Sequence, residues 1–412
     1  MTVSRTLLLA GSGPIVPGSP SAETPLLGLP LLRRTALAAR RAGFDRVYVL
    51  GEAAASPVLE GTGARGLPRD APESALPPGR IVLLPDRIVA TTAWLRGVRD
   101  MPVEPGRLLR FGDGAVVETS DPEPLARVLA RATLLPAVVS AWGGVLPAAD
   151  AGSAPEVAPP FEVATHADLD AAEDRLLGGL IKKEDGILTR LISRKISLAV
   201  TRRLAPTRVT PNAMTFVSVA LGLAGAWCFL SPEPTRQAAG GLLFLLHSIL
   251  DGCDGELARL KFQESRRGGL LDFWGDNLVH VAVFSAFAVA WSSASEESWP
   301  LALGALAVSG TVLCAVFIYM YAMRPRPGGG PLLTTVSPSR RSKLTQILDA
   351  LARRDFIYLV TLLGLFGKAY WFLAPVAVGT PGFFLALLLM ALGGRRLHGA
   401  TGPGQSSPQS AR

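Results

Sequence analysis

The hydrophobic residues of this 412-residue chain follow two different patterns. Up to about residue 190, short apolar runs alternate with stretches of helical periodicity, which is typical of a soluble α/β domain. From about residue 212, the apolar runs are near the length that a bilayer demands. We expect six spans, at residues 212–231, 236–254, 270–292, 299–322, 356–372 and 374–392. The chain is therefore expected to join an N-terminal α/β domain to an all-α six-helix transmembrane bundle.

The pattern divides the chain into five parts. These are a cytoplasmic domain (1–150), a linker (151–180), a juxtamembrane helix (181–210), a membrane domain (211–396) and a disordered tail (397–412), with an Ala- and Pro-rich seam at residues 145–162. In the juxtamembrane part, Leu191, Ile192 and Ile196 interleave with Arg190 and Arg194. This favours an amphipathic helix on the inner membrane surface, with a plain linker helix as the alternative.

Composition and charge support a membrane protein. The sequence is 49% hydrophobic and 18% charged, with a net charge of +8. The basic residues gather in the loops after the second and fourth spans and in the tail, whereas Glu296 and Glu297 occupy the opposite side. By the positive-inside rule, both termini face the cytoplasm of a multi-pass protein in the cell inner membrane. No nucleic-acid motif accompanies the charge, and the N-terminus shows no signal peptide.

Four aspartates stand inside otherwise apolar segments, where charges are costly and usually functional. Asp251 and Asp254 share one helical face with Ala258, and Asp272 and Asp276 share a face of the next helix. If these two helices are antiparallel, the pairs meet near the connecting turn. Carboxylate oxygens suit Mg²⁺ or Mn²⁺. Two such ions would bridge a pyrophosphate and stabilise charge on the attacking and leaving oxygens.

The residues around the aspartates form a recognisable pattern. Asp251-x-x-Asp254-Gly255-x-x-Ala258-Arg259 is followed, after eight residues, by Gly268-x-x-x-Asp272-x-x-x-Asp276. This resembles the signature of the CDP-alcohol phosphotransferase family at every defining position. The resemblance implies transfer of a phosphoalcohol or phosphatidyl group from a CDP-alcohol to an acceptor hydroxyl, with release of CMP. It also implies a homodimer.

The family resemblance implies roles for individual residues. Asp251, Asp254 and Asp272 would be metal ligands, and Asp276 would be the general base with some contact to the second ion. The residues implied to bind the CDP-alcohol are Pro211, Asn212, Thr215, Asp251, Gly255, Ala258, Arg259, Ser265 and Gly268. For the TPNxxT element that contains Pro211, cytidine binding and helix capping by Asn212 both remain open. His247 and His280 are expected to pack rather than to bind metal.

The N-terminal part reads as strands alternating with helices, which implies a parallel sheet with ligands at the carboxyl ends of its strands. It resembles sugar-nucleotidyltransferase domains, with Gly11 and Gly13 in the nucleotide loop and Asp86 as a metal ligand. Two basic residues of that family are missing here: Gly13 is followed by Pro14, and Thr24 replaces a lysine. Both a degenerate domain and an active nucleotidyltransferase remain open.

The order of the two domains resembles bifunctional inositol-phosphate cytidylyltransferase/di-inositol-phosphate-phosphate synthases. That resemblance implies an alternative function, in which the N-terminal domain also makes CDP-inositol from CTP and inositol 1-phosphate. A cation transporter and an inactive scaffold are the competing classes. The chain shows no internal repeat of the transporter kind, and its intact aspartates argue against a scaffold. The donor and acceptor alcohols stay open.

Overall fold

The computed structural model describes residues 4–13, 18–67, 76–150, 160–181, 186, 188–323 and 355–399. The chain divides into two compact units. The first comprises Met1–Leu180 with the short segments Ala205–Thr207 and Leu260–Phe262. The second comprises Ile181–Leu204, Arg208–Arg259 and Gln263–Arg412. The expected disordered tail lies almost entirely outside the described residues.

A seven-stranded sheet forms the first unit, in the order β10-β8-β9-β6-β1-β4-β5. The strands are β1 (Ser4–Ala10), β4 (Arg46–Val49), β5 (Arg65–Gly66), β6 (Gly79–Pro85), β8 (Leu108–Phe111), β9 (Gly114–Thr119) and β10 (Ala148–Asp150). β1 pairs in parallel with β4 and β6, as the sequence predicted. β9 runs antiparallel to β6 and β8, so the sheet is mixed and mostly parallel.

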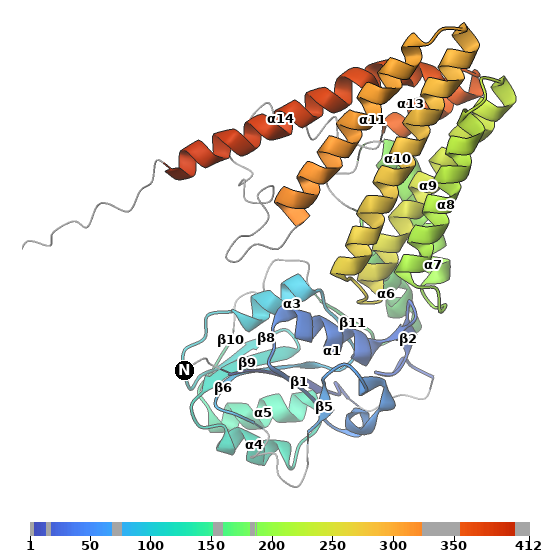
Figure 1. Ribbon diagram of the computed structural model, residues 1–412. Helices are drawn as coiled ribbons and strands as arrows, with labels where there is room; N and C mark the ends of the chain where they lie inside the picture. Colours follow the sequence, from blue (N-terminus) through green and yellow to red (C-terminus); the bar gives the residue numbers. More distant parts are fainter. Residues whose placement is uncertain are drawn as a thin grey trace, which may run out of the picture. The chain divides into compact units, whose positions relative to one another are not determined.

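Helices cover both faces of this sheet (Figure 1). α1 (Leu31–Ala42) and α3 (Thr92–Arg99) pack on one face, and α4 (Glu123–Leu129) and α5 (Leu135–Val145) pack on the other. The strands supply the two cores alternately, because successive side chains point to opposite faces. Leu7 and Leu9 belong to the first core, and Leu8 belongs to the second.

Short elements complete the first unit. Two small sheets join β2 (Pro25–Leu26) to β3 (Leu29–Pro30) and β7 (Ile88–Val89) to β11 (Phe161–Glu162). Short helical turns lie at η1 (Glu52–Ala55) and η2 (Pro57–Leu59). α6 (His166–Gly178) begins with a capping box, in which Thr165 and Asp168 each bond the other's backbone.

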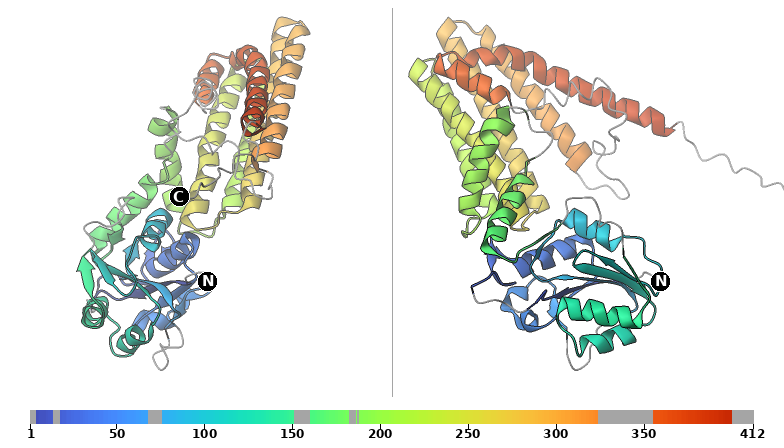
Figure 2. Two further views of the ribbon diagram at one scale, coloured as in Figure 1. Left: turned by 90° about the vertical axis from the view of Figure 1, so that its left-hand side faces the viewer. Right: turned by 180° about the vertical axis from the view of Figure 1, so that it is seen from behind.

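The second unit is helical (Figure 2). Its elements are η3 (Thr189–Ser193), α7 (Arg194–Leu204), α8 (Pro211–Phe229), α9 (Pro234–Leu260), α10 (Arg266–Ser295), α11 (Trp299–Ile318), η4 (Tyr319–Met323), α13 (Phe356–Leu365), η6 (Ala369–Phe372) and α14 (Leu373–Gly399). Its core includes Phe229, Phe244 and Phe287, all of which are buried.

Four described helical stretches are long and apolar enough to cross a membrane: Pro211–Phe229, Arg266–Ser295, Trp299–Tyr321 and Ala369–Leu392. They correspond to the first, third, fourth and sixth expected spans. The second expected span lies in α9, which is 27 residues long but carries several charged side chains. The fifth falls on α13, which has 10 residues, and on η6. The chain is thus an integral membrane protein, and the count of six spans remains a prediction.

Candidate metal and nucleotide site

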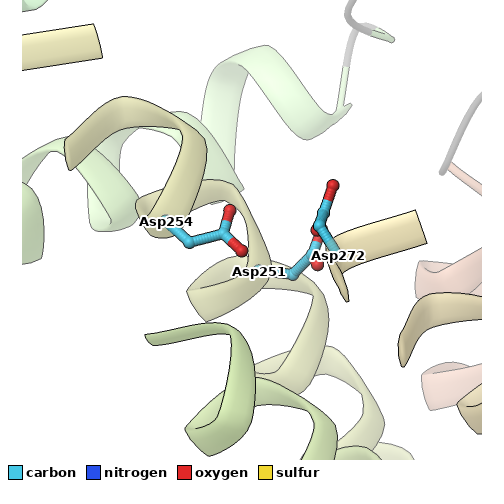
Figure 3. Close-up of side chains that lie close together, drawn as sticks. All are labelled: Asp251, Asp254 and Asp272. Carbon is cyan, nitrogen blue, oxygen red and sulfur yellow. The ribbon is translucent and has the colours of Figure 1, made fainter. Parts of the chain in front are cut away.

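α9 and α10 bring the acidic residues together. α9 ends at Leu260 and α10 begins at Arg266, so a short turn joins two helices that run side by side (Figure 1). Asp251 and Asp254 lie near the end of α9, and Asp272 lies near the start of α10. Figure 3 shows the three carboxylates turned toward one another. Asp251 and Asp254 are buried, at 4% and 6% exposure, and Asp272 is half-buried.

These three side chains fit a divalent cation. One carboxylate oxygen from each lies within 4.8 Å of the others. Opposite ligands of a bound Mg²⁺ are roughly 4 Å apart, so a small adjustment of the carboxylates would complete the coordination. Buried carboxylates this close repel one another unless a positive charge lies among them. The cluster therefore fits a divalent cation in both its geometry and its donor atoms.

α8 supports this cluster from the side. The Thr215 hydroxyl, which is 3% exposed, donates a hydrogen bond to Oδ2 of Asp254. At the start of α8, the Thr210 side chain accepts from the backbone N–H of Ala213 at 3.3 Å. Thr210 is therefore the N-cap, and the expectation that Asn212 caps the helix is wrong. With Pro211 in the first turn, Asn212 lies one position inside the helix, where it is exposed.

A pocket of about 180 Å³ opens beside the aspartates. Ser265 forms one edge as the N-cap of α10, accepting from the Gly268 N–H at 3.0 Å. The pocket is lined by Pro211, Asn212, Thr215, Asp254, Gly255, Ala258, Arg259, Gln263, Glu264, Ser265, Gly268, Gly269 and Asp272. Of the residues expected to bind the donor, Asp251 alone is absent from this lining.

Two glycines of the signature line this pocket. A Cβ on Gly268 would lie 3.1 Å from both the Asn212 side-chain oxygen and the Ser265 hydroxyl. A Cβ on Gly255 would lie 3.4 Å from Nη1 of Arg259. A residue larger than glycine at position 268 would crowd two polar side chains that line the pocket, whereas a Cβ at position 255 would make an ordinary contact with the flexible end of Arg259.

Asp276 lies outside the group of three. It is one helical turn beyond Asp272, and its Oδ1 is 3.8 Å from Nε2 of His247. The His247 ring is buried, and its Nδ1 lies 2.8 Å from the backbone oxygen of Ser218. Because a carbonyl oxygen only accepts, Nδ1 carries the proton and Nε2 faces Asp276 as an acceptor when the ring is neutral. His280 instead packs among Phe244, Phe284 and Phe356.

A second, larger cavity of about 670 Å³ begins at Asp272 and Asp276. Its walls come from α10, α11, η4, α13, η6 and α14, and its lining residues include Phe273, Phe284, Ile318, Phe356, Phe372, Val376 and Phe383. Thr311 and Thr380 also line it, but their hydroxyls donate to backbone oxygens of their own or a neighbouring helix. No lysine or arginine is among its described lining residues. This cavity is therefore mainly apolar beyond its carboxylate end.

In the first unit, Gly11 and Asp86 adjoin at the carboxyl ends of β1 and β6. A Cβ on Gly11 would lie 3.7 Å from Oδ2 of Asp86. Asp86 is 8% exposed, and its Oδ1 has no hydrogen-bond partner among the described residues. Burial raises the pKa of Asp86; Arg87 opposes this rise and Glu162 adds to it. By contrast, a Cβ on Gly13 would meet no atom within 4 Å.

Two further acidic residues escaped the sequence analysis. Glu162, on β11, accepts a hydrogen bond from the Ser12 hydroxyl and faces Asp86. It lies beyond the expected boundary of the N-terminal domain at residue 150. Glu256 is wholly buried on α9, two positions after Asp254. The sequence does carry one indication of it, a charged residue inside an otherwise apolar stretch. The basic residues that follow the fourth expected span, Arg324, Arg326, Arg340, Arg341 and Lys343, lie outside the described residues.

Comparison with known proteins gives a consistent assignment. Residues 208–339 match the family model of CDP-alcohol phosphatidyltransferase. The chain is 33% identical over 176 residues to a bifunctional IPC transferase and DIPP synthase from Rubrobacter xylanophilus, covering 42% of this chain and 39% of that protein. A protein of the same name from Archaeoglobus fulgidus is 32% identical over 152 residues, covering 37% and 30%. The matches thus span well under half the length of these relatives.

Among solved structures, the chain is similar to Mycobacterium tuberculosis phosphatidylinositol phosphate synthase with CDP-DAG bound. The identity is 19% and the TM-score is 0.32, covering 53% of this chain and 100% of that one. The family match contains every position of the acidic signature and the helices that carry it. Residues 208–339, which hold the acidic signature, therefore match a CDP-alcohol phosphatidyltransferase domain in the C-terminal part of the chain.

Proposed function

We propose that this protein transfers a phosphoalcohol or phosphatidyl group from a CDP-alcohol to an acceptor hydroxyl. The observation that carries this proposal is the arrangement of Asp251, Asp254 and Asp272 beside a pocket lined by the remaining signature residues. A transporter would not need Gly255, Ala258 and Arg259 grouped around that pocket. An inactive scaffold would not need a buried carboxylate cluster, because such a cluster is costly without a cation.

In the proposed reaction, the acceptor oxygen attacks the β-phosphorus of the donor. The new phosphorus–oxygen bond forms as the anhydride bond breaks, and CMP leaves. Asp276 takes the proton of the acceptor hydroxyl, since it lies one turn beyond Asp272 at the mouth of the larger cavity. The Arg259 guanidinium, at the pocket wall, would pair with a donor phosphate.

The cofactor is proposed to be two Mg²⁺ or Mn²⁺ ions. Asp251, Asp254 and Asp272 would hold them, with Asp276 contributing to the second. Bound ions supply charge stabilisation on the phosphate oxygens as the anhydride breaks. A homodimer is part of the proposal, by resemblance to the family.

The larger cavity bears on the substrates. Its walls are mainly apolar, its hydroxyls bond to backbone, and its polar end holds Asp272 and Asp276. A volume of about 670 Å³ falls within the range of small-molecule sites. We therefore favour at least one substrate with a hydrocarbon portion, such as CDP-diacylglycerol, over a pair of water-soluble polyols.

We further propose six spans with the site and both termini in the cytoplasm. On this proposal, α9 and the α13–η6 region are the two spans beyond the four candidate helices. The juxtamembrane segment supports a position at the membrane surface, because Leu191, Ile192 and Ile196 are 55%, 43% and 44% exposed. Apolar side chains exposed beside basic ones suit a membrane surface. A C-terminal fluorescent-protein fusion should be bright, whereas an alkaline phosphatase fusion should be inactive; the reverse result would refute the orientation.

The activity test uses purified protein with Mg²⁺ and either CDP-diacylglycerol or CDP-inositol, together with a panel of polyols. Release of CMP that depends on an acceptor is the expected result. Asp276→Asn should abolish it while one Mn²⁺ ion still binds, because Asp251, Asp254 and Asp272 remain. CMP release unchanged in Asp276→Asn would refute the proposed base.

A second candidate is the bifunctional form, in which the first unit makes CDP-inositol. The observation in its favour is the buried, unpartnered Oδ1 of Asp86 beside Gly11 and Glu162, at the carboxyl ends of parallel strands. Pyrophosphate release from CTP and inositol 1-phosphate, lost in Asp86→Asn, would establish it. If no pyrophosphate appears with Mg²⁺ or Mn²⁺, the first unit is degenerate.

A further inference from the structure

Glu256 is a buried carboxylate with no place in the signature. It lies on α9 between Asp254 and Arg259, and none of its side chain is exposed. At about 100° per residue, Glu256 points away from the helical face that presents Asp251 and Asp254. Its charge is therefore directed into the protein on the opposite side of α9 from the metal cluster.

That side of α9 meets α7 through a set of polar contacts. Nη1 of Arg194 donates to Oε1 of Glu256 at 2.7 Å, and the Ser197 hydroxyl donates to the same oxygen at 2.8 Å. The Thr201 hydroxyl donates to Oε2 at 2.7 Å. Arg194, Ser197 and Thr201 are spaced three and four residues apart, so they lie on one face of α7. We call these four residues the α7–α9 clamp.

The two helices are in close contact around the clamp. A Cβ on Gly252 would lie 3.1 Å from Nη1 of Arg194. The buried Cys253 thiol donates to the backbone oxygen of Ser197 at 3.5 Å. Small residues at two successive positions of α9 thus let Arg194 and Ser197 approach the backbone, directly opposite the metal-site face.

α7 is in turn held at its N-terminal end. The Ser193 hydroxyl lies 2.7 Å from the Tyr358 hydroxyl on α13. The Thr189 hydroxyl donates to Oδ1 of Asp355 at 2.9 Å. Because η3, which leads directly into α7, is bonded to Tyr358 of α13 and to Asp355 just before it, the clamp defines how α9 is rotated about its own axis.

We propose that Glu256 is a positioning residue for the transfer reaction, acting through the α7–α9 clamp to aim Asp251, Asp254 and Arg259 at the site. This inference rests on the proposed function. A small rotation of α9 would move Asp251 and Asp254 together relative to Asp272 on α10. Apolar packing alone permits such a rotation more readily than a charged pair with two additional hydrogen bonds, whose geometry is directional.

The test compares Glu256→Leu with the double variant Arg194→Met/Glu256→Leu. Removing one partner leaves a buried charge and should lower the melting temperature, whereas replacing both with apolar groups is often neutral for stability. Mn²⁺ binding is followed by electron paramagnetic resonance on detergent-solubilised protein, with Asp251→Asn as the binding-deficient reference. We expect the double variant to melt near the wild-type temperature but to bind Mn²⁺ about ten-fold more weakly, because the carboxylates of Asp251 and Asp254 are then less well oriented.

A second measurement separates positioning from general stability. Glu256→Gln keeps an oxygen acceptor, so it should recover part of the Mn²⁺ affinity lost in Glu256→Leu. In CMP release, the KM for the CDP-alcohol should rise in parallel with the Mn²⁺ dissociation constant. A double variant with wild-type Mn²⁺ affinity and KM would overturn the proposal. Wild-type protein that binds Mn²⁺ but releases no CMP would instead reject the proposed function and leave the Mn²⁺ comparison intact.

Discussion

At the scale of single residues, the metal ligands depend on neighbours outside the signature. Thr215 belongs to α8, yet its hydroxyl holds Asp254 of α9 in place. Nucleotide contact by this residue remains a prediction, whereas its bond to a carboxylate is present in the structure. Partners of this kind fix the direction of a ligand, and their loss typically reduces affinity or activity by about 10–100-fold.

Thr215→Val tests this contact. The change preserves shape but removes the donor, so we expect Mn²⁺ affinity and CMP release to fall about ten-fold or more. Ser285→Ala is the matched control, because that hydroxyl on α10 donates within its own helix, to the oxygen of Val281. Equal effects of the two changes would show that the Thr215 bond does not orient Asp254.

Asp86 gives a prediction for pH. Since burial raises its pKa in the folded state, the carboxyl group contributes stability while it is protonated, and that contribution is lost as the pH rises through the folded pKa. Asp86→Asn should therefore slow hydrogen exchange in β1 and β6 at pH 7, measured without divalent cations. The gain should shrink toward pH 4. Asp113→Asn changes an exposed turn residue and should leave hydrogen exchange in β1 and β6 unchanged. Faster exchange in Asp86→Asn would contradict the prediction that the buried Asp86 carboxylate destabilises the protein at pH 7.

At the scale of elements, close packing of α8 on α10 brings Thr215 near the aspartates. A Cβ on Gly275 would lie 2.6 Å from Cγ2 of Val219, and one on Gly222 would lie 2.6 Å from Cγ1 of Val279. These contacts are too short for any larger residue unless the helices separate. Small residues at helix interfaces allow this approach in membrane proteins.

Gly275→Ala should consequently destabilise the protein. Overpacking of this kind costs about 1–3 kcal/mol, and the melting temperature should fall. Gly382→Ala on α14 is the control, because a Cβ there would meet no atom within 4 Å. If both variants melt at the same temperature, the contact between α8 and α10 is looser than these distances indicate.

Local patterns predicted many of these elements, and non-local contacts account for the remainder. The apolar runs of β1 and β6 and the antiparallel approach of α9 to α10 follow from neighbours in the sequence. The position of β9 between β6 and β8 does not follow from neighbours in the sequence, because the rest of the sheet sets the antiparallel pairing there. Glu256 is a clearer case: its partner Arg194 is 62 positions away, so its role could not be read from α9 alone.

At the scale of the whole molecule, cation binding and folding are linked. Ligands that bind only the folded state stabilise it, by about 2.7 kcal/mol at a hundred times the dissociation constant. Mg²⁺ should accordingly raise the melting temperature of the wild-type protein. The increase should be larger than in Asp254→Asn, because Mg²⁺ also removes the repulsion among the carboxylates of the wild type. In a chelator, Asp254→Asn should be the more stable of the two. Scanning calorimetry in detergent, with Mg²⁺ and with a chelator, would compare the melting temperatures of the two proteins.

The polarity of α9 also constrains how the protein enters a bilayer. This helix carries Asp251, Asp254 and Glu256 within its last ten residues, and all three are buried. Alone in lipid, three ionised groups would each cost about 3 kcal/mol on insertion scales. α9 is therefore unsuited to integrate by itself as it leaves the ribosome. Its stable placement must wait until α10 has been synthesised, so a cysteine introduced into α9 should stay accessible to a water-soluble thiol reagent in nascent chains truncated before α10.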